Sequence, residues 1–199
     1  PGAASARPVD GDALSVSTAP AAEGAAGAAG GGGAAGGAPA LEAVRLRPLC
    51  AADAPLEDRF VRELSDDSRY KRFMGTVQSL SPAKLAELTD VDQVQHVALG
   101  AFVAAGTGER LVGVARYVVD ASGQSCEFAV TVSDDWQRSG LAGRLMHALM
   151  ARARARGLAR IEGLVLASNR PMLKFMRQLG FAFAHEPDDP RTVRAVRAP

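Results

Sequence analysis

Three strand-like runs follow one another in the middle of the chain, with only short turns between them. They cover His96–Ala104, Leu111–Val119 and Cys126–Val132, and glycines stand in the intervening turns. Strands joined by connections this short pair antiparallel, because a parallel pair needs a crossover of a dozen or more residues. The centre of the chain is therefore predicted to be an antiparallel sheet on which the remaining elements pack.

Strand and helix patterns alternate on the C-terminal side of this block. We expect a long helix from about 141 to 156, then a strand at 161–167, a helix at 171–179 and a strand at 181–184. Gly157 is suited to end the long helix, because glycine adopts the left-handed conformation at little cost. Strand–helix–strand units of this kind form crossovers within one sheet.

Elements on the N-terminal side complete the pattern. We expect a short strand at 44–47, a helix at 53–64 and a helix that opens at Ser81-Pro82, while 193–196 has the pattern of one more short strand. The whole order predicts the α/β (α+β) class: a mixed, mainly antiparallel central sheet with helices on both faces.

The first 40 residues have a different composition. Alanine and glycine dominate them, and such residues bury too little apolar area to offset the entropy lost on ordering the backbone. We predict a disordered tail at 1–40 and one domain at 41–199. The tail is either a linker to another domain or partner, or a dispensable leader.

Charge and cysteine content narrow the function classes. The formal net charge is +1, which provides no basic field for a nucleic acid. The two cysteines have no metal-ligand or disulfide spacing, so we expect no metal site. No apolar run reaches the ~20 residues that cross a bilayer, and the start lacks the features of a signal peptide. A cytoplasmic protein without a membrane partner is expected.

The segment Val130–Gly143 carries the strongest functional pattern. It comprises the end of a strand, a short polar loop and a glycine at the start of the long helix. Unpaired N–H groups and the positive end of the helix dipole make such a start an anion site, to which Arg138 and Arg144 add charge. An ordinary strand-to-helix turn fits the spacing equally well.

Two motifs resemble the GNAT N-acetyltransferase superfamily over about residues 44–186. Gln137-Arg138-Ser139-Gly140-Leu141-Ala142 is similar to that family's pyrophosphate-binding signature, and Asn169–Phe181 is similar to its Asn-led helix that ends in Gly-Phe. The resemblance implies acetyl-CoA as co-substrate, with Asn169 at the pantetheine arm. The cofactor-binding residues expected on this basis are Val130, Thr131, Val132, Gln137, Arg138, Ser139, Gly140, Leu141, Ala142, Gly143, Arg144, Asn169 and Met172.

A narrower resemblance points to the GNAT domain of Pat-type protein lysine acetyltransferases. The segments that carry it are Leu46-Arg47-Pro48, Phe60-Val61, Leu64-Ser65, Ser68–Phe73, Leu80-Ser81, Leu88-Thr89 and Glu127–Val130. It implies that Glu127 is the general base. A base is needed because only a fraction on the order of 10⁻³ of a lysine amine with pKa ~10.4 is uncharged at pH 7. From the residues alone, the alternative is that Glu127 is an exposed or salt-bridged strand glutamate.

Two further groups would serve the reaction. The backbone N–H of Val130 or Val132 would stabilise the oxyanion if the strand separates from its neighbour there. Many GNAT enzymes place a tyrosine on the last helix as general acid, and this chain has Met176. Either the thiolate leaves unassisted or another donor serves.

The expected function is transfer of an acetyl group from acetyl-CoA to a primary amine by direct attack, with a protein lysine as acceptor. Two alternatives stay open. One is an enzyme that acetylates a small-molecule amine, and the other is a non-catalytic module that senses CoA.

Overall fold

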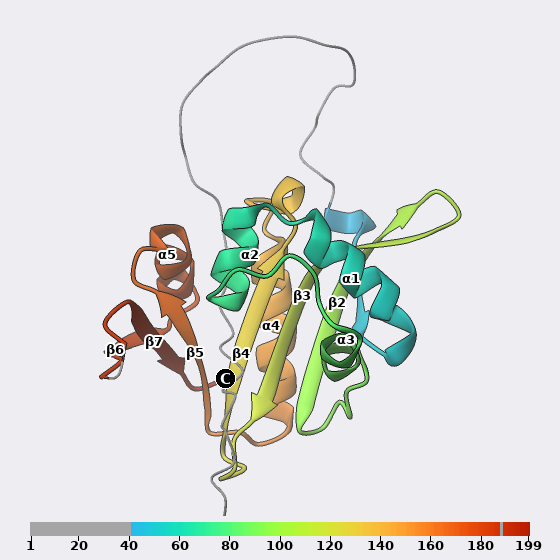
Figure 1. The fold of residues 1–199 in the computed structure, drawn as a ribbon. Helices are drawn as coiled ribbons and strands as arrows, with labels where there is room; N and C mark the ends of the chain where they lie inside the picture. Colours follow the sequence, from blue (N-terminus) through green and yellow to red (C-terminus); the bar gives the residue numbers. More distant parts are fainter. Residues whose placement is uncertain (1–40, 188) are drawn as a thin grey trace, which may run out of the picture.

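A computed structural model describes residues 41–187 and 189–199 as a seven-stranded sheet with helices on both faces (Figure 1). The strands are β1 (Arg45–Pro48), β2 (His96–Ala105), β3 (Gly108–Val119), β4 (Ser125–Val132), β5 (Arg160–Leu166), β6 (Ala182–His185) and β7 (Thr192–Arg197). The helices are α1 (Ala54–Glu63), α2 (Asp66–Phe73), α3 (Pro82–Thr89), α4 (Leu141–Ala155) and α5 (Arg170–Gln178), with short 3-10 turns η1 (Leu41–Ala43), η2 (Ala51–Asp53) and η3 (Asp134–Trp136). The tail predicted at 1–40 lies outside the described residues.

The sheet order is β1-β2-β3-β4-β5-β7-β6. Each of the strands β1, β2 and β3 pairs antiparallel with the strand that follows it in the sequence. Strands β4 and β5 pair parallel, and β7 pairs antiparallel with both β5 and β6. Helix α4 makes the crossover between the two parallel strands. The predicted fold class, a mixed and mainly antiparallel sheet between helices, is confirmed.

The short strand predicted at 193–196 is confirmed, and one helix was not predicted. The weak pattern at 193–196 is β7, which inserts between β5 and β6 and pairs with β5 from Ile161 to Leu166. Helix α2 has no counterpart in the prediction, because Asp66–Phe73 is mostly polar and shows little helical periodicity. Its start is defined by a cap instead, with Ser65 Oγ accepting a hydrogen bond from the Ser68 N–H at 3.2 Å.

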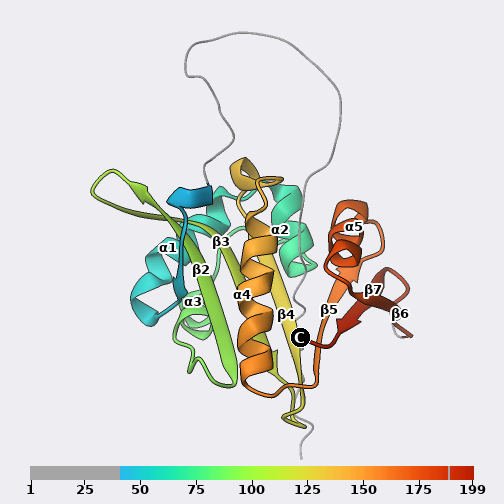
Figure 2. The same ribbon diagram turned by 180° about the vertical axis from the view of Figure 1, so that it is seen from behind.

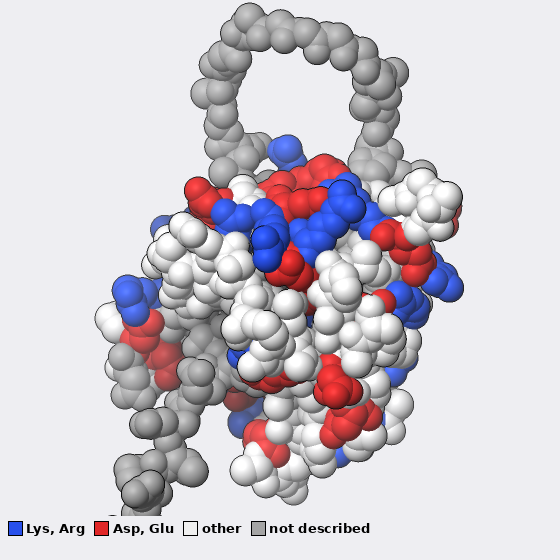
Figure 3. Space-filling view, turned by 45° about the vertical axis from the view of Figure 1, so that its right-hand side comes forward, with Lys and Arg blue, Asp and Glu red and all other residues white. Residues whose placement is uncertain are grey.

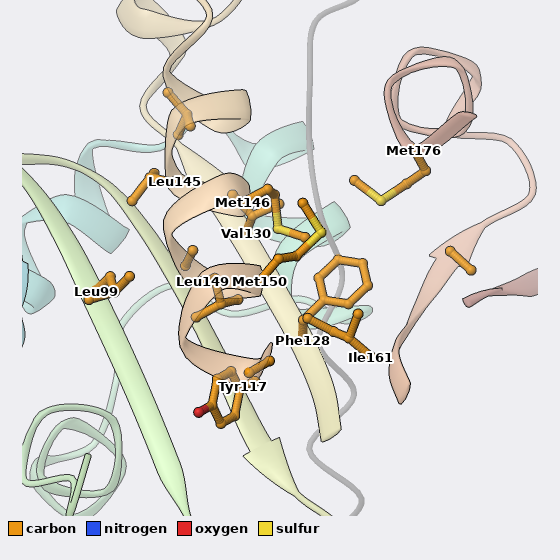
Figure 4. Close-up of a cluster of buried hydrophobic side chains, with 14 of the residues drawn as sticks. Leu99, Tyr117, Phe128, Val130, Leu145, Met146, Leu149, Met150, Ile161 and Met176 are labelled. Carbon is orange, nitrogen blue, oxygen red and sulfur yellow. The ribbon is translucent and has the colours of Figure 1, made fainter. Parts of the chain in front are cut away.

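One face of the sheet packs on α4 and α5. Leu145, Met146 and Leu149 of α4 are fully buried against Phe128 of β4 and Ile161 of β5 (Figure 4). The ring of Phe128 also lies 5.2 Å from that of Phe181, between centroids. This core joins the two sides of the sheet beneath the point where β4 meets β5.

The opposite face is covered by α1, α2 and α3, and the view from behind places α4 on the other side (Figure 2). A buried ion pair lies within this layer: Arg116 of β3 binds Glu57 of α1 at 2.8 Å and donates to the Leu88 carbonyl of α3 at 2.9 Å. Burial raises the pKa of Glu57 and lowers that of nearby Arg72, on α2, to about 9. Arg116 thus holds α1 and α3 to β3.

Strands β4 and β5 pair over only three residues, from Ser125↔Arg160 to Glu127↔Glu162. Beyond that row β5 stays paired with β7, and β4 stays paired with β3. Gly163 packs tightly at the point of divergence, since a Cβ there would lie 2.8 Å from the Phe128 ring and 3.0 Å from its carbonyl oxygen. The two strands form a fork whose closed end is at Glu127 and Glu162.

Substituting Gly163→Ala is expected to destabilise the protein by about 1–3 kcal/mol, because the new methyl group overlaps both a ring and a backbone atom. Thermal unfolding should show a melting temperature lower by several degrees. Gly108→Ala is the control, since its Cβ would find no atom closer than 4.0 Å. Equal melting temperatures for the two variants would contradict this account of the fork.

Candidate active site

The backbone of β4 faces the open side of the fork at alternate residues. Asp120 N–H donates to the Ser125 carbonyl at 2.9 Å, and Ser133 N–H donates to the Val112 carbonyl at 3.0 Å. In an antiparallel pair the residues bonded to one neighbour alternate with those that face away. Val130 and Val132 therefore direct their N–H groups away from β3, past the last row that pairs with β5.

Side chains of β4 divide between the two faces of the sheet. Val130 and Val132 are buried in the core beneath α4, and Glu127 and Thr131 point to the face of α1–α3. Thr131 is 1% exposed, and its Oγ1 has no hydrogen-bond partner among the described residues. Glu127 is half-buried at the closed end of the fork.

The positive charge of Arg116 lies on the same face as Glu127. Arg116 is opposite Ala129 in the β3–β4 pair, one diagonal step from the Val118↔Glu127 row. Helix α2, which contributes Arg72, overlies β4 in both views of the ribbon (Figures 1 and 2). The environment of Glu127 is thus a half-buried sheet surface with fixed charges nearby.

The loop after β4 opens α4 with an unusual backbone. Arg138 and Gly140 have φ values of 60° and 90°, and Gly140 is the N-cap of α4. The Leu141 N–H donates to Ser139 Oγ at 3.2 Å, and the first helical bond runs from Arg144 N–H to the Gly140 carbonyl at 3.1 Å. The N–H groups of the two residues between them have no helical acceptor, which is the geometry of an anion site.

The side chains of this loop are engaged within the protein. Gln137 Nε2 donates to Ser68 Oγ at 3.2 Å and to Asp134 Oδ1 at 3.0 Å, and Arg144 donates to the Leu41 carbonyl at 2.7 Å. Arg138 is exposed. An anion at the start of α4 would accordingly meet backbone N–H groups and glycine rather than the side chains of Gln137 and Arg144.

Asp134 is a residue that the sequence analysis missed. Its carboxylate accepts from Ser65 N–H at 2.8 Å, Ser65 Oγ at 2.9 Å and Ser68 Oγ at 2.7 Å. These bonds fasten the start of α2 to the loop before α4, across about 69 residues of sequence. No local pattern marks the contact, because both partners lie in polar segments.

The second motif begins α5. Asn169 is the N-cap, and its Oδ1 accepts from the Met172 N–H at 3.2 Å, while Met172 is fully buried in the core. Met176 is also fully buried and points inward from α5 (Figure 4). Met176, the residue that stands where the resemblance implies a tyrosine general acid, is thus a core residue without a hydroxyl group.

Within residues 41–187 and 189–199, no helix combines the length and apolarity needed to span a membrane. The same part of the chain contains no group of three or more His, Cys, Asp or Glu side chains placed to hold a metal ion.

Comparison with known proteins gave consistent matches. The model of the GNAT acetyltransferase family matches residues 61–181. A curated acetyltransferase of Pseudomonas aeruginosa is 38% identical over 146 residues, which are 73% of this chain and 78% of that protein.

Two matches concern Pat proteins. The acetyltransferase Pat of Mycolicibacterium smegmatis is 31% identical over 142 residues, or 71% of this chain but only 42% of Pat. Among solved structures, the GNAT domain of S. lividans PAT has a TM-score of 0.71 and 29% identity, and the match covers 78% of this chain and 90% of that domain.

Gly140→Asp is expected to weaken CoA binding at least tenfold, or about 1.4 kcal/mol, because it adds bulk and negative charge at the start of α4. Isothermal titration calorimetry with CoA measures the change. Gly157→Asp is a matched control. Gly157 also has a positive φ, 81°, so the substitution imposes a similar backbone strain, but Gly157 lies just beyond the other end of α4, far from the loop. Unchanged affinity in folded Gly140→Asp protein would refute an anion site here.

Proposed function

This chain belongs to the GNAT family of acetyltransferases, and on that premise we propose that its acceptor is a lysine side chain of a protein, with Glu127 as the general base. Acetyl transfer from acetyl-CoA to an amine is the chemistry of the family. The observation that carries the proposal is the position of Glu127, at the closed end of the fork between β4 and β5. A pantetheine arm that enters the fork would bring its thioester to this carboxylate.

The proposed cofactor site follows the two edges of the fork. The loop from Gln137 to Arg144 would receive the pyrophosphate, mainly through the backbone at Gly140, Ala142 and Gly143. The β4 segment from Val130 to Val132 would receive the pantetheine arm on its free backbone edge. Asn169 and Met172 would act from the start of α5, where Asn169 already stabilises the helix.

In the proposed reaction Glu127 takes the proton from the acceptor nitrogen, directly or through one water, as that nitrogen bonds to the thioester carbon. The N–H of Val130 or Val132 stabilises the negative charge that develops on the carbonyl oxygen. The carbon–sulfur bond then breaks and CoA leaves as a thiolate, which is a weak enough base to depart without an acid at Met176.

Support for a protein acceptor comes from the Pat resemblance. Identity to M. smegmatis Pat is 31%, and the S. lividans PAT domain has the same fold. This chain spans less than half the length of that Pat, so the likeness concerns the catalytic domain and not the rest of the relative.

Three acidic side chains of α2 and α3 are paired with cations on their own helices. Asp66 and Asp67 pair with Arg69 and Lys71 on the same helix, and Glu87 pairs with Lys84. On the face seen in Figure 3, positive and negative side chains are interspersed rather than gathered by sign. Selection of the acceptor is therefore expected to depend on contacts close to Glu127.

A small-molecule amine is the second candidate, and one observation favours it. A cavity of about 300 Å³ lies against α2 and the segment after it. Its lining residues are Asp66, Arg69, Tyr70, Gly75, Thr76, Val77 and Gln78. This volume is at the lower end of the range for small-ligand sites.

Glu127→Gln is expected to lower turnover by about 10²–10⁴-fold while leaving acetyl-CoA affinity unchanged, because the amide keeps the shape but cannot accept the proton. Activity of the unmodified enzyme should rise with pH through the pKa of the base. Steady-state kinetics from pH 5 to 9, with CoA calorimetry alongside, checks both. Full activity of the variant at pH 7 would make Glu127 structural.

The acceptor class is tested with labelled acetyl-CoA in a cell lysate, followed by mass spectrometry. Acetyl groups are expected on lysines of one or a few proteins, and on none when Glu127→Gln protein replaces the enzyme. Rapid acetylation of polyamines or other small amines, with no labelled protein, would instead favour the second candidate.

A further inference from the structure

A second carboxylate stands beside Glu127 at the closed end of the fork. Glu162 is its register partner in the last paired row of β4 and β5. Register partners on adjacent strands are about 4.8 Å apart and project to the same face. Glu127 and Glu162 therefore emerge side by side where the strands diverge.

The face on which Glu162 lies is set by its neighbours along β5. Ile161 and Val165 are fully buried in the core beneath α4 and α5. Glu162 and Leu164 alternate with them and are half-buried on the opposite face, the side of α1–α3. The core under those helices includes no described residue of β5, β6 or β7. The apolar core under α1–α3 therefore does not extend to β5, and the surface around Glu162 is formed by side chains of β5 and β7.

Two arginines fix the Glu162 carboxylate. Arg194 of β7 binds Oε1 at 3.0 Å, and Arg160 binds Oε2 at 3.0 Å. A carboxylate offers about four acceptor sites, so these contacts leave room for further donors. The two positive charges also offset the repulsion between adjacent Glu127 and Glu162.

We propose that Glu162 binds the ammonium group of the incoming amine beside Glu127 and so determines a preference for cationic acceptors. The inference rests on Glu127 being the base. Lysine arrives at neutral pH as an ammonium ion with three donors. Glu162 accepts from that ion; one ammonium proton passes to water before attack, and Glu127 takes the second as the nitrogen bonds to the thioester carbon. Glu162 is a binding residue in this scheme, and no bond to it forms or breaks.

The competing explanation is that Glu162 only joins β5 to β7. Glu186 provides the matched control, because it binds the same Arg194, at 2.6 Å, and its side chain is buried to a similar extent, 13% exposed against 17%. Glu186 follows β6, on the far side of β7 from the fork. A purely structural role predicts similar effects for the two glutamates.

Direct binding separates the two explanations. The probes are two peptides with blocked ends and glycine and alanine flanks, one with a central lysine and the other with norleucine, titrated into the protein saturated with CoA. Glu162→Gln should weaken the lysine peptide about tenfold and leave the norleucine peptide unchanged. Glu186→Gln should change neither, and Glu162→Asp, which keeps the charge, should recover part of the affinity.

Kinetics supply the second readout. Glu162→Gln should raise the acceptor KM about tenfold. Its kcat and its KM for acetyl-CoA should stay within about twofold of the unmodified enzyme, whereas Glu127→Gln should lose kcat. Equal weakening of both peptides, or equal effects of Glu162→Gln and Glu186→Gln, would overturn the proposal. So would a melting temperature that falls together with kcat while the acceptor KM stays constant.

The role proposed for Glu162 can be tested separately from the proposal that the acceptor is a protein lysine. If the enzyme acetylates spermidine and not the lysine peptide, the protein acceptor is wrong, and the spermidine KM of the same variants decides the role of Glu162. If neither cation is acetylated, while an uncharged amine such as an aromatic amine is, both proposals fail.

Discussion

The structure depends on the unequal pairing of β5 with its two neighbours, β4 on one edge and β7 on the other. Strand β5 pairs with β7 from Ile161 to Leu166 but with β4 over three residues only, so β4 and β5 diverge beyond Glu127 and Glu162. The Phe128 ring fits against Gly163 at this point and joins the two halves through the core under α4 and α5. One local loss of strand pairing thereby leaves a backbone edge of β4 without a strand partner and places two carboxylates side by side at its closed end.

Polar contacts across long stretches of sequence position the other walls of the site. Asp134 holds the start of α2 against the loop that opens α4, and the buried pair of Arg116 and Glu57 joins α1 to the centre of the sheet. Removing one partner of a buried ion pair is costly, because the remaining charge stays out of water. Hydrogen bonds thus join the start of α2 directly to the loop that precedes α4.

Much of the fold could be predicted because its signals are local. The three central strands alternate or run apolar between glycine turns, and α4 ends at Gly157, whose φ is 81°. Helix α2 was missed because a cap and long-range bonds define it rather than an apolar stripe. The position of β7 was missed for a related reason: six residues of strand pattern do not say which edge they will occupy.

For the site, the sequence by itself determined the backbone features. Gly140 at the start of a helix and Glu127 as an acid in an apolar strand follow from short-range rules of conformation and burial. Only the tertiary structure decided what surrounds them. It turned Gln137 towards Ser68 and Arg144 towards Leu41, and it brought Glu162 next to Glu127. The reason is physical: backbone geometry depends on residues a few positions apart, whereas side-chain partners depend on which strands become neighbours, and that choice is made by packing of the whole chain.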